Sequence, residues 1–255
     1  MGRELEAVTA KIRIILSKVR LFARRTYFRN IHFVRALIFD VVNFYERIFH
    51  RSMSTPVIDS ISPIFINLDS RIDRRKHIEK ELKKIGFRRF ERFPAVENKL
   101  GILGCTLSHK GLIENGISSG VDVIFVVEDD AKFICSKKSL EKILRDFLEN
   151  SNAEVLCIGN NVQDYPTRLS RYLLRTQDTQ TTSCYFMKKE IFSEYLQKLN
   201  KGIDLMNKGF IAEGAIDIIW KELQSDHVFA IPRKKILIQI ASHSDILNEK
   251  VRYLA

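Results

Sequence analysis

Three adjacent acidic residues, Glu128, Asp129 and Asp130, are the group in this chain best suited to chemistry. They follow an apolar run at residues 121–127, which is typical of a strand buried on both faces of a parallel sheet. Open α/β sheets bind their ligands just beyond the carboxyl ends of such strands. Adjacent carboxylates repel one another unless a cation offsets them, and oxygen ligands suit Mg²⁺ or Mn²⁺. The pattern favours a metal–nucleotide site, and a solvated acidic turn is the simpler alternative.

The elements that must position these acids alternate between short apolar strands and periodic helices. Strands are expected at residues 64–68, 90–96, 121–127, 155–158, 183–187, 228–231 and 236–240, and helices at 73–85, 107–117, 140–148, 189–199 and 213–223. This alternation predicts an α/β domain with a largely parallel sheet. The polar stretch 160–180 lacks periodicity and is a candidate lid or acceptor loop.

The composition places the chain among globular proteins. With 255 residues, 45% hydrophobic and 29% charged, it can hold one sizeable core and an appendage, and global disorder is excluded. Its four cysteines are scattered without a CxxC pair, so a reducing compartment is expected. No apolar run reaches the length of a membrane span, and Glu4 and Glu6 argue against a secretory signal. A cytoplasmic location is the resulting expectation.

The basic character is concentrated in the first 55 residues. Eleven Lys/Arg against four Asp/Glu give this segment +7 of the total net charge of +11. Apolar residues recur there at helical spacing, which predicts basic amphipathic helices across residues 5–49. A Ser- and Pro-rich stretch at 52–63 marks a boundary, so we expect a helical extension at 1–55 and a catalytic body at 56–255.

Four short motifs stand in order along the body. They are FINLDSRIDR at 65–74, RFPAV at 92–96, GCTLSH at 104–109 and EDDA at 128–131. In this order and spacing the chain resembles glycosyltransferase family 25, bacterial lipooligosaccharide and lipopolysaccharide sugar transferases related to procollagen galactosyltransferases. Tyr185, Asp217 and the SDI at 244–246 look like weaker marks of that family, and the resemblance covers residues 62–248.

The chain departs from the family pattern at three places. Glu97 and Asn98 replace a common Asp-Gly pair, and the residues at 181–183 replace a common glycine. The basic extension has no counterpart in the family. The first two differences leave the choice of acceptor open.

The resemblance implies a fold, a donor and a cofactor. The fold would be GT-A-like (Rossmann-like), a mostly parallel sheet flanked by helices. The donor would be a UDP-sugar, with galactose or glucose favoured, and the cofactor Mn²⁺ or Mg²⁺. The sugar would pass with inversion to a saccharide or glycoconjugate acceptor, as in lipopolysaccharide biosynthesis.

The acidic motif can be given roles from the chemistry of sugar transfer. Displacing a diphosphate from an anomeric carbon builds negative charge on the leaving group, which a cation stabilises. We expect Asp130 to bind that cation directly, with Glu128 or Asp129 assisting through water or the ribose. His243, after the last expected strand, is a candidate for a further metal ligand.

Five further residues are candidates for binding the donor. Arg71 and Arg74 follow the first strand, where guanidinium groups suit phosphates or ribose, and surface charge is the alternative. Asn67 ends that strand, and it either binds the base or ribose or forms a turn. Ser108 and His109 are expected early in a helix whose amides face the diphosphate, or else they cap and pack.

An inverting reaction also needs a base to deprotonate the acceptor hydroxyl. Asp217, within GAIDIIW at 214–220, resembles a family acid and has apolar neighbours that would raise its pKa. A buried carboxylate with a purely structural role is the alternative. Glu213, expected one helical turn earlier, is the substitute.

A rival interpretation gives the chain no catalytic activity. The basic helices would bind anionic lipid or nucleic acid, and the α/β body would be a degenerate scaffold. The intact acidic motif and its companion motifs argue against degeneration, and no nucleic-acid motif supports that partner. We favour docking on an anionic membrane surface for residues 5–28 and packing on the body for 31–49.

A chain shortened to begin near Ser54 should therefore lose binding to anionic liposomes, because the +7 segment supplies both apolar contact and charge. Liposome co-sedimentation at low and high salt measures this, and UDP-sugar hydrolysis by the shortened chain is the control. Undiminished, salt-insensitive liposome binding would rule out the docking role.

Overall fold

The computed structural model describes residues 56–240, 242–244 and 249–251. The helical extension predicted at residues 1–55 lies outside the described residues, and it stays a prediction. Within the described part, no helix combines the length and apolar character needed to cross a bilayer.

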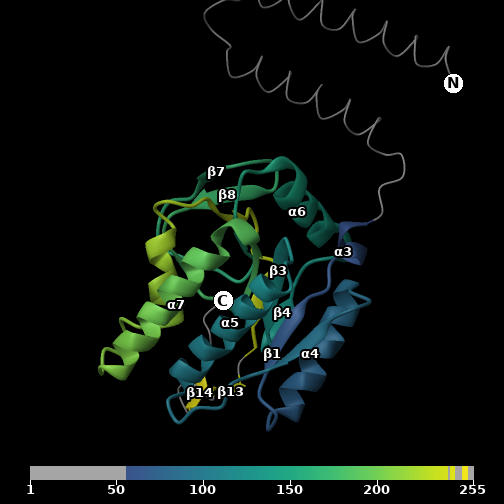
Figure 1. Ribbon diagram of the computed structural model, residues 1–255. Helices are drawn as coiled ribbons and strands as arrows, with labels where there is room; N and C mark the ends of the chain where they lie inside the picture. Colours follow the sequence, from purple (N-terminus) through teal and green to yellow (C-terminus); the bar gives the residue numbers. More distant parts are fainter. Residues whose placement is uncertain (1–55, 241, 245–248, 252–255) are drawn as a thin grey trace, which may run out of the picture. The chain divides into compact units, whose positions relative to one another are not determined.

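The body is built on an eight-stranded sheet (Figure 1). Its strands, in spatial order, are β2 Glu91–Pro94, β1 Ile64–Asn67, β3 Val123–Glu128, β10 Cys184–Lys188, β5 Val155–Cys157, β11 Phe229–Pro232, β8 Leu173–Thr176 and β7 Thr167–Arg168. Six strands share one direction, and β10 and β8 run the opposite way. The predicted class, a mostly parallel α/β sheet flanked by helices, is confirmed.

Helices cover both faces of the sheet. The long ones are α4 Ile72–Ile85, α5 Gly101–Ser118, α6 Lys137–Asn150 and α7 Phe192–Asn207, and the short ones are α3 Val57–Ser60 and α8 Ile216–Ile219. Alternate residues of β3 belong to different cores. Phe125 packs with residues of α4 and α6, and Val126 packs with residues of α5 and α7. This two-sided burial explains why the β3 sequence is continuously apolar.

Three short antiparallel strand pairs lie outside the central sheet among the described residues. The chain turns at Asp129–Asp130 into β4 Ala131–Phe133, which pairs with β12 Leu237–Gln239. Two further antiparallel pairs join β6 Asn161–Val162 to β9 Thr179–Gln180, and β13 Ser242–Ser244 to β14 Glu249–Val251. The β4–β12 pair holds residues from near the end of the described chain beside the acidic motif.

Two of the expected helices differ from the observed ones. The helix expected at 107–117 begins at Gly101, six residues earlier. The helix expected at 213–223 is the single turn α8 followed by the 3-10 helix η2 Trp220–Leu223. Gly214 packs against α7 so closely that a Cβ there would lie 2.4 Å from the Gly202 carbonyl oxygen, and Ala215 is extended. Tertiary packing therefore breaks a segment with helical periodicity.

The polar stretch 160–180 also differs from the expectation of an unstructured loop. It contains β6, β7, β8 and β9, and β8 pairs with β11 to extend the central sheet. Its strands are short and only partly buried, so the sequence carries little alternation of apolar and polar residues.

Candidate functional site

A cavity of about 370 Å³ lies where β1 and β3 end and the acidic motif begins. Its lining residues are Ile66, Asn67, Leu68, Ser70, Arg74, Ala95, Val96, Glu97, Asn98, Gly101, Gly104, Cys105, Ser108, His109, Glu128, Asp129, Asp130 and Gln239. The carboxyl ends of parallel strands are the expected place for a ligand in this architecture. Among these lining residues, four acids face a single basic residue, Arg74, so the cavity is electronegative.

Asp129 is held from two sides. The Asn67 amide donates to Asp129 Oδ2 over 2.7 Å, and the Arg74 guanidinium donates to Oδ1 over 3.0 Å. The other Asn67 groups are also engaged, because its amide donates to the Arg71 carbonyl and its oxygen accepts from Arg92. Asn67 and Arg74 line the cavity, but their polar groups first of all anchor Asp129, and their role in donor binding stays a prediction.

Asp130 is also buried, but its negative charge is stabilised by weaker contacts. The Gln239 amide donates to its two oxygens over 3.3 and 3.2 Å. Burial, reinforced by the nearby Glu128 carboxylate, raises the pKa of Asp130 from 3.8 to about 7. Of the three acids, Asp130 therefore gains most from a cation.

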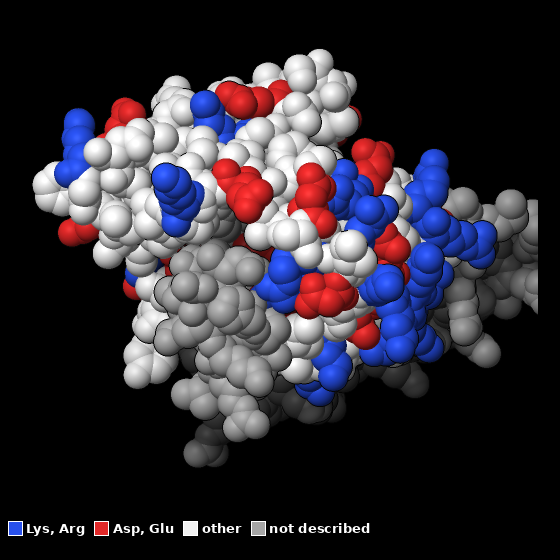
Figure 2. All heavy atoms as spheres, turned by 90° about the horizontal axis from the view of Figure 1, so that it is seen from below, with Lys and Arg blue, Asp and Glu red and all other residues white. Residues whose placement is uncertain are grey.

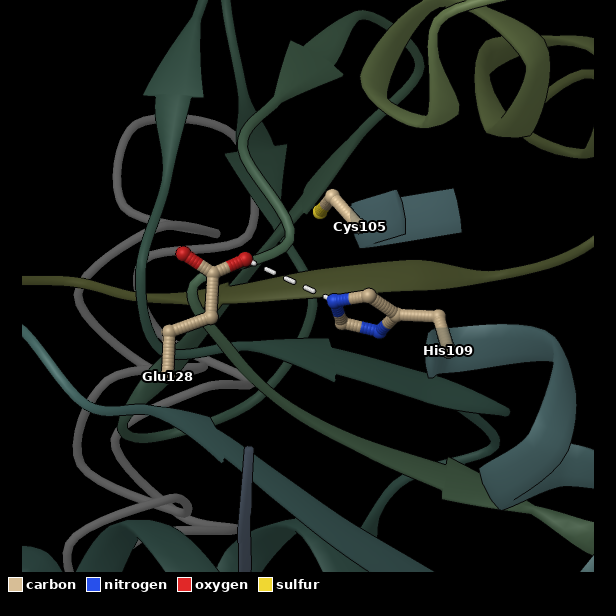
Figure 3. Close-up of side chains that lie close together, drawn as sticks. All are labelled: Cys105, His109 and Glu128. Carbon is tan, nitrogen blue, oxygen red and sulfur yellow. Dashed lines mark ion pairs between the residues drawn. The ribbon is translucent and has the colours of Figure 1, made fainter. Parts of the chain in front are cut away.

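Glu128 points toward α5 (Figure 3). Its Oε1 lies 3.5 Å from His109 Nε2 and accepts a long 3.4 Å hydrogen bond from the Thr182 hydroxyl. His109 is fully buried, and its Nδ1 lies 2.9 Å from the Tyr185 hydroxyl on β10. Cys105 Sγ joins this group, since the sulfur, the imidazole and the carboxylate offer ligand atoms within 4.8 Å of one another. Burial raises the pKa of the Cys105 thiol, and Glu128 raises it further.

Ser108 lines the cavity and makes two structural hydrogen bonds, in line with the packing alternative. Because α5 begins at Gly101, Ser108 and His109 lie about two turns into the helix, and their amides do not face a ligand from the helix N-terminus. The Ser108 hydroxyl accepts from the Val96 amide over 2.8 Å and donates to the Gly104 carbonyl over 2.7 Å. A Cβ at Gly104 would lie 2.6 Å from the Val96 carbonyl oxygen. The GCTLSH motif thus holds the wall at 95–98 against the helix.

Arg71 lies outside the lining of the cavity. Its guanidinium forms a two-point ion pair with Asp73, at 3.0 and 2.9 Å, and this pair lowers the pKa of Asp73 to about 2. Further along α4, Arg75, Lys76 and Lys80 are exposed. Figure 2 shows Lys and Arg side chains gathered toward one side of the face that it draws. These three exposed residues therefore fit the alternative interpretation, in which the basic run is surface charge.

The two candidate bases occupy different environments. Asp217 is half-buried in the first turn of α8, and burial raises its pKa, with Glu128 adding to the increase. Asp217 and Glu128 also both raise the pKa of Cys105, so the three groups share one region. Glu213 is exposed in a turn before α8, not on the same helix as expected. Neither acid belongs to the lining of the cavity.

His243 lies in β13, which pairs with β14. Its side chain lies outside what the structure describes, so its role as a metal ligand stays a prediction.

The residues present suit a divalent cation. Asp130 offers two buried carboxylate oxygens that accept long hydrogen bonds from the Gln239 amide, and Glu128 raises its pKa. Hard cations such as Mg²⁺ and Mn²⁺ prefer oxygen donors of this kind. Asp129 is less suited, because Arg74 already compensates its charge.

Several residues that line the cavity were not predicted to contact a ligand. Glu97 and Asn98 had been noted only as departures from the family pattern, and they form part of the wall. Gln239 is 109 residues from its partner Asp130, so no local signal connects them. Cys105 was not singled out as a ligand contact, and its place in the GCTLSH motif four residues before His109 was the available clue.

Comparisons with known proteins give distant likenesses only. No protein-family model matches the chain, and no curated protein matches it. Solved structures that it resembles include a glycosyltransferase involved in glycosylation of the major capsid of PBCV-1 (10% identity, 68% of this chain and 92% of that chain, TM-score 0.37). Another is a nucleoside-diphosphate-sugar pyrophosphorylase from Vibrio cholerae RC9 (16% identity, 72% of this chain and 78% of that chain, TM-score 0.36). A third is an inositol-1-phosphate CTP transferase from T. maritima (13% identity, 71% of this chain and 89% of that chain, TM-score 0.39).

These neighbours are glycosyltransferases and nucleotidyltransferases at low identity. The likeness to family 25 remains a resemblance of motifs, and the case for a function depends on the site.

Replacing Asp130 should show how much its buried charge destabilises the folded protein. With metal removed by a chelator, Asp130→Asn should raise the midpoint of thermal unfolding. The gain should grow from about pH 4 to about pH 8, because the folded carboxyl keeps its proton to about pH 7 whereas the unfolded one loses it near 3.8.

Asp122→Asn, at an exposed acid just before β3, is the matched control and should show no comparable gain. A lower midpoint for Asp130→Asn across this pH range would mean that the described neighbours already stabilise the charge of Asp130.

Proposed function

We propose that this protein is a metal-dependent glycosyltransferase related to family 25. It moves a sugar, with galactose or glucose favoured, from a UDP-sugar to a saccharide or glycoconjugate acceptor with inversion. The single observation that supports this most is the electronegative cavity at the ends of β1 and β3, with buried Asp130 at its edge. A donor diphosphate needs a cation to enter such a cavity, and Asp130 is the acid best placed to hold one.

The chain's own residues divide the work of donor binding. Asp130, with Glu128 nearby, holds the cation, which would stabilise negative charge on the departing UDP. Arg74 and Asn67 fix Asp129 at the turn after β3, so the backbone there keeps one conformation. The wall at 95–98, fastened to α5 through Ser108, bounds the space for the sugar or the nucleotide.

Asp217 is the proposed base. Its carboxylate would take the proton of the acceptor hydroxyl as that oxygen forms a bond to the anomeric carbon and the bond to the UDP oxygen breaks. Half-burial favours proton uptake by Asp217, since it raises the pKa above that of an exposed acid. Glu213, exposed in the preceding turn, lacks this environment.

Two further parts of the proposal come from the sequence alone. A cytoplasmic location and docking of residues 5–28 on an anionic membrane surface would bring the enzyme to membrane-linked acceptors. His243 would add a ligand to the cation.

The proposed activity can be tested with the full-length chain and a panel of UDP-sugars. We expect release of UDP that requires Mn²⁺ or Mg²⁺ and is abolished in Asp130→Asn at saturating metal. Near-wild-type turnover by that variant would remove Asp130 from the metal site. Release of pyrophosphate from a nucleoside triphosphate and a sugar phosphate, with no UDP release, would instead indicate a nucleotidyltransferase.

Asp217→Asn should lower sugar transfer about a hundredfold or more and leave UDP affinity unchanged, because the side chain acts on the acceptor. Transfer rates and UDP titration measure the two effects separately. Glu213→Gln is the comparison variant. If this variant loses sugar transfer and Asp217→Asn does not, Glu213 is the base. A parallel fall in UDP affinity for Asp217→Asn would place Asp217 in the donor site or the core.

A further inference from the structure

Three side chains of different chemistry meet on the α5 side of the cavity. Cys105 and His109 are one helical turn apart on α5, and Glu128 ends β3 (Figure 3). Their sulfur, nitrogen and oxygen ligand atoms all lie within 4.8 Å of one another. Such a mixed donor set differs from the oxygen-only set that Mg²⁺ and Mn²⁺ prefer, and it is the kind that binds Zn²⁺.

His109 provides a second, independent sign of a ligand. Its side chain is fully buried, yet Nε2 has no hydrogen-bond partner among the described residues. A buried polar atom without a partner is costly, so it calls for a ligand or another explanation. Figure 3 shows this nitrogen directed at the Glu128 carboxylate, with the Cys105 sulfur on the same side.

The far side of the imidazole has an outer hydrogen-bonding partner, as metal-binding histidines commonly do. His109 Nδ1 lies 2.9 Å from the Tyr185 hydroxyl, and the two rings stack with centroids 5.7 Å apart. Outer partners of this kind orient the ring and set which nitrogen is available to a metal. Tyr185 therefore directs Nε2 toward Glu128.

The spacing is close to that of a tetrahedral zinc site. Bond lengths of about 2.0–2.3 Å place neighbouring ligand atoms about 3.3–3.6 Å apart. The His109 Nε2 to Glu128 Oε1 distance is already 3.5 Å, and the sulfur needs to approach by about 1.2–1.5 Å at most. All three residues line the cavity, which gives an ion access to them.

We propose that Cys105, His109 and Glu128 form a binding site for a soft divalent cation of the Zn²⁺ class, beside and distinct from the oxygen site at Asp130. This goes beyond the proposed sugar transfer and does not require it. A bound ion would hold the Glu128 carboxylate on the α5 side and leave Asp130 as the principal acid for the cation of the donor.

Cobalt is the probe that separates the two sites, because only a thiolate ligand gives Co²⁺ an intense charge-transfer absorption in the near ultraviolet. The full-length, metal-free protein, titrated with Co²⁺ under reducing conditions, should develop this band at one equivalent, and Zn²⁺ should abolish it. Cys105→Ser should lose the band, and His109→Gln should weaken Co²⁺ affinity about tenfold or more.

Two control variants make the result specific. Cys135→Ser alters a half-buried thiol that is not among the residues lining the cavity, and it should keep the band. Asp130→Asn should keep it as well, although the same variant abolishes the proposed sugar transfer. Circular dichroism and thermal midpoints establish that each variant is folded.

Absence of the band in the wild-type protein would overturn the proposal, as would a band that persists in Cys105→Ser. The first result would leave His109 and Glu128 as an ion pair. Neither result bears on UDP release, so the two proposals succeed or fail separately.

Discussion

Negative charge is buried at the end of β3, and the arrangement of the surrounding side chains depends on the need to stabilise it. Asp129 and Asp130 are 7% and 4% exposed and adjacent in sequence, so their charges cannot both be left to solvent. The fold compensates Asp129 with Arg74 and Asn67, which lie on α4 and β1. For Asp130 it supplies the Gln239 amide as a hydrogen-bond donor, and Arg74 lowers the pKa of Asp130 less than burial and Glu128 raise it. The asymmetry leaves one carboxylate whose charge is best stabilised by something that binds.

The strands of this site were predictable because their burial is encoded locally. A continuous apolar run for β3 and the glycine that ends α4 are signals carried by a few neighbouring residues. Gly86 has a φ of +113°, and its amide closes the last turn of α4, as a C-terminal glycine should. The order of the strands then placed Asn67 and the acidic motif at one edge of the sheet.

The parts that escaped prediction depend on contacts between distant segments. Nothing near Ser108 in sequence indicates that its hydroxyl holds the Val96 amide, and nothing near His109 indicates Tyr185. Periodicity alone also placed the start of α5 too late, since Gly101 and Gly104 look unfavourable to a helix. At Gly104 the absence of a side chain is what permits the close approach to Val96. These features follow from tertiary packing, which propensities do not contain.

The reversed strand β10 has a consequence for how the protein reaches its folded state. Cys184 pairs with Val127, and the Glu128 amide donates to the Ser183 carbonyl, so the start of β10 completes the acidic end of β3. Those partners are more than fifty residues apart, whereas β1 and β2 are joined by a single helix and its turns. Loop closure over such separations is slow, and local pairings form first. Bringing Thr182, Tyr185 and Glu128 into one site therefore carries a larger loop-closure cost than pairing β1 with β2 does.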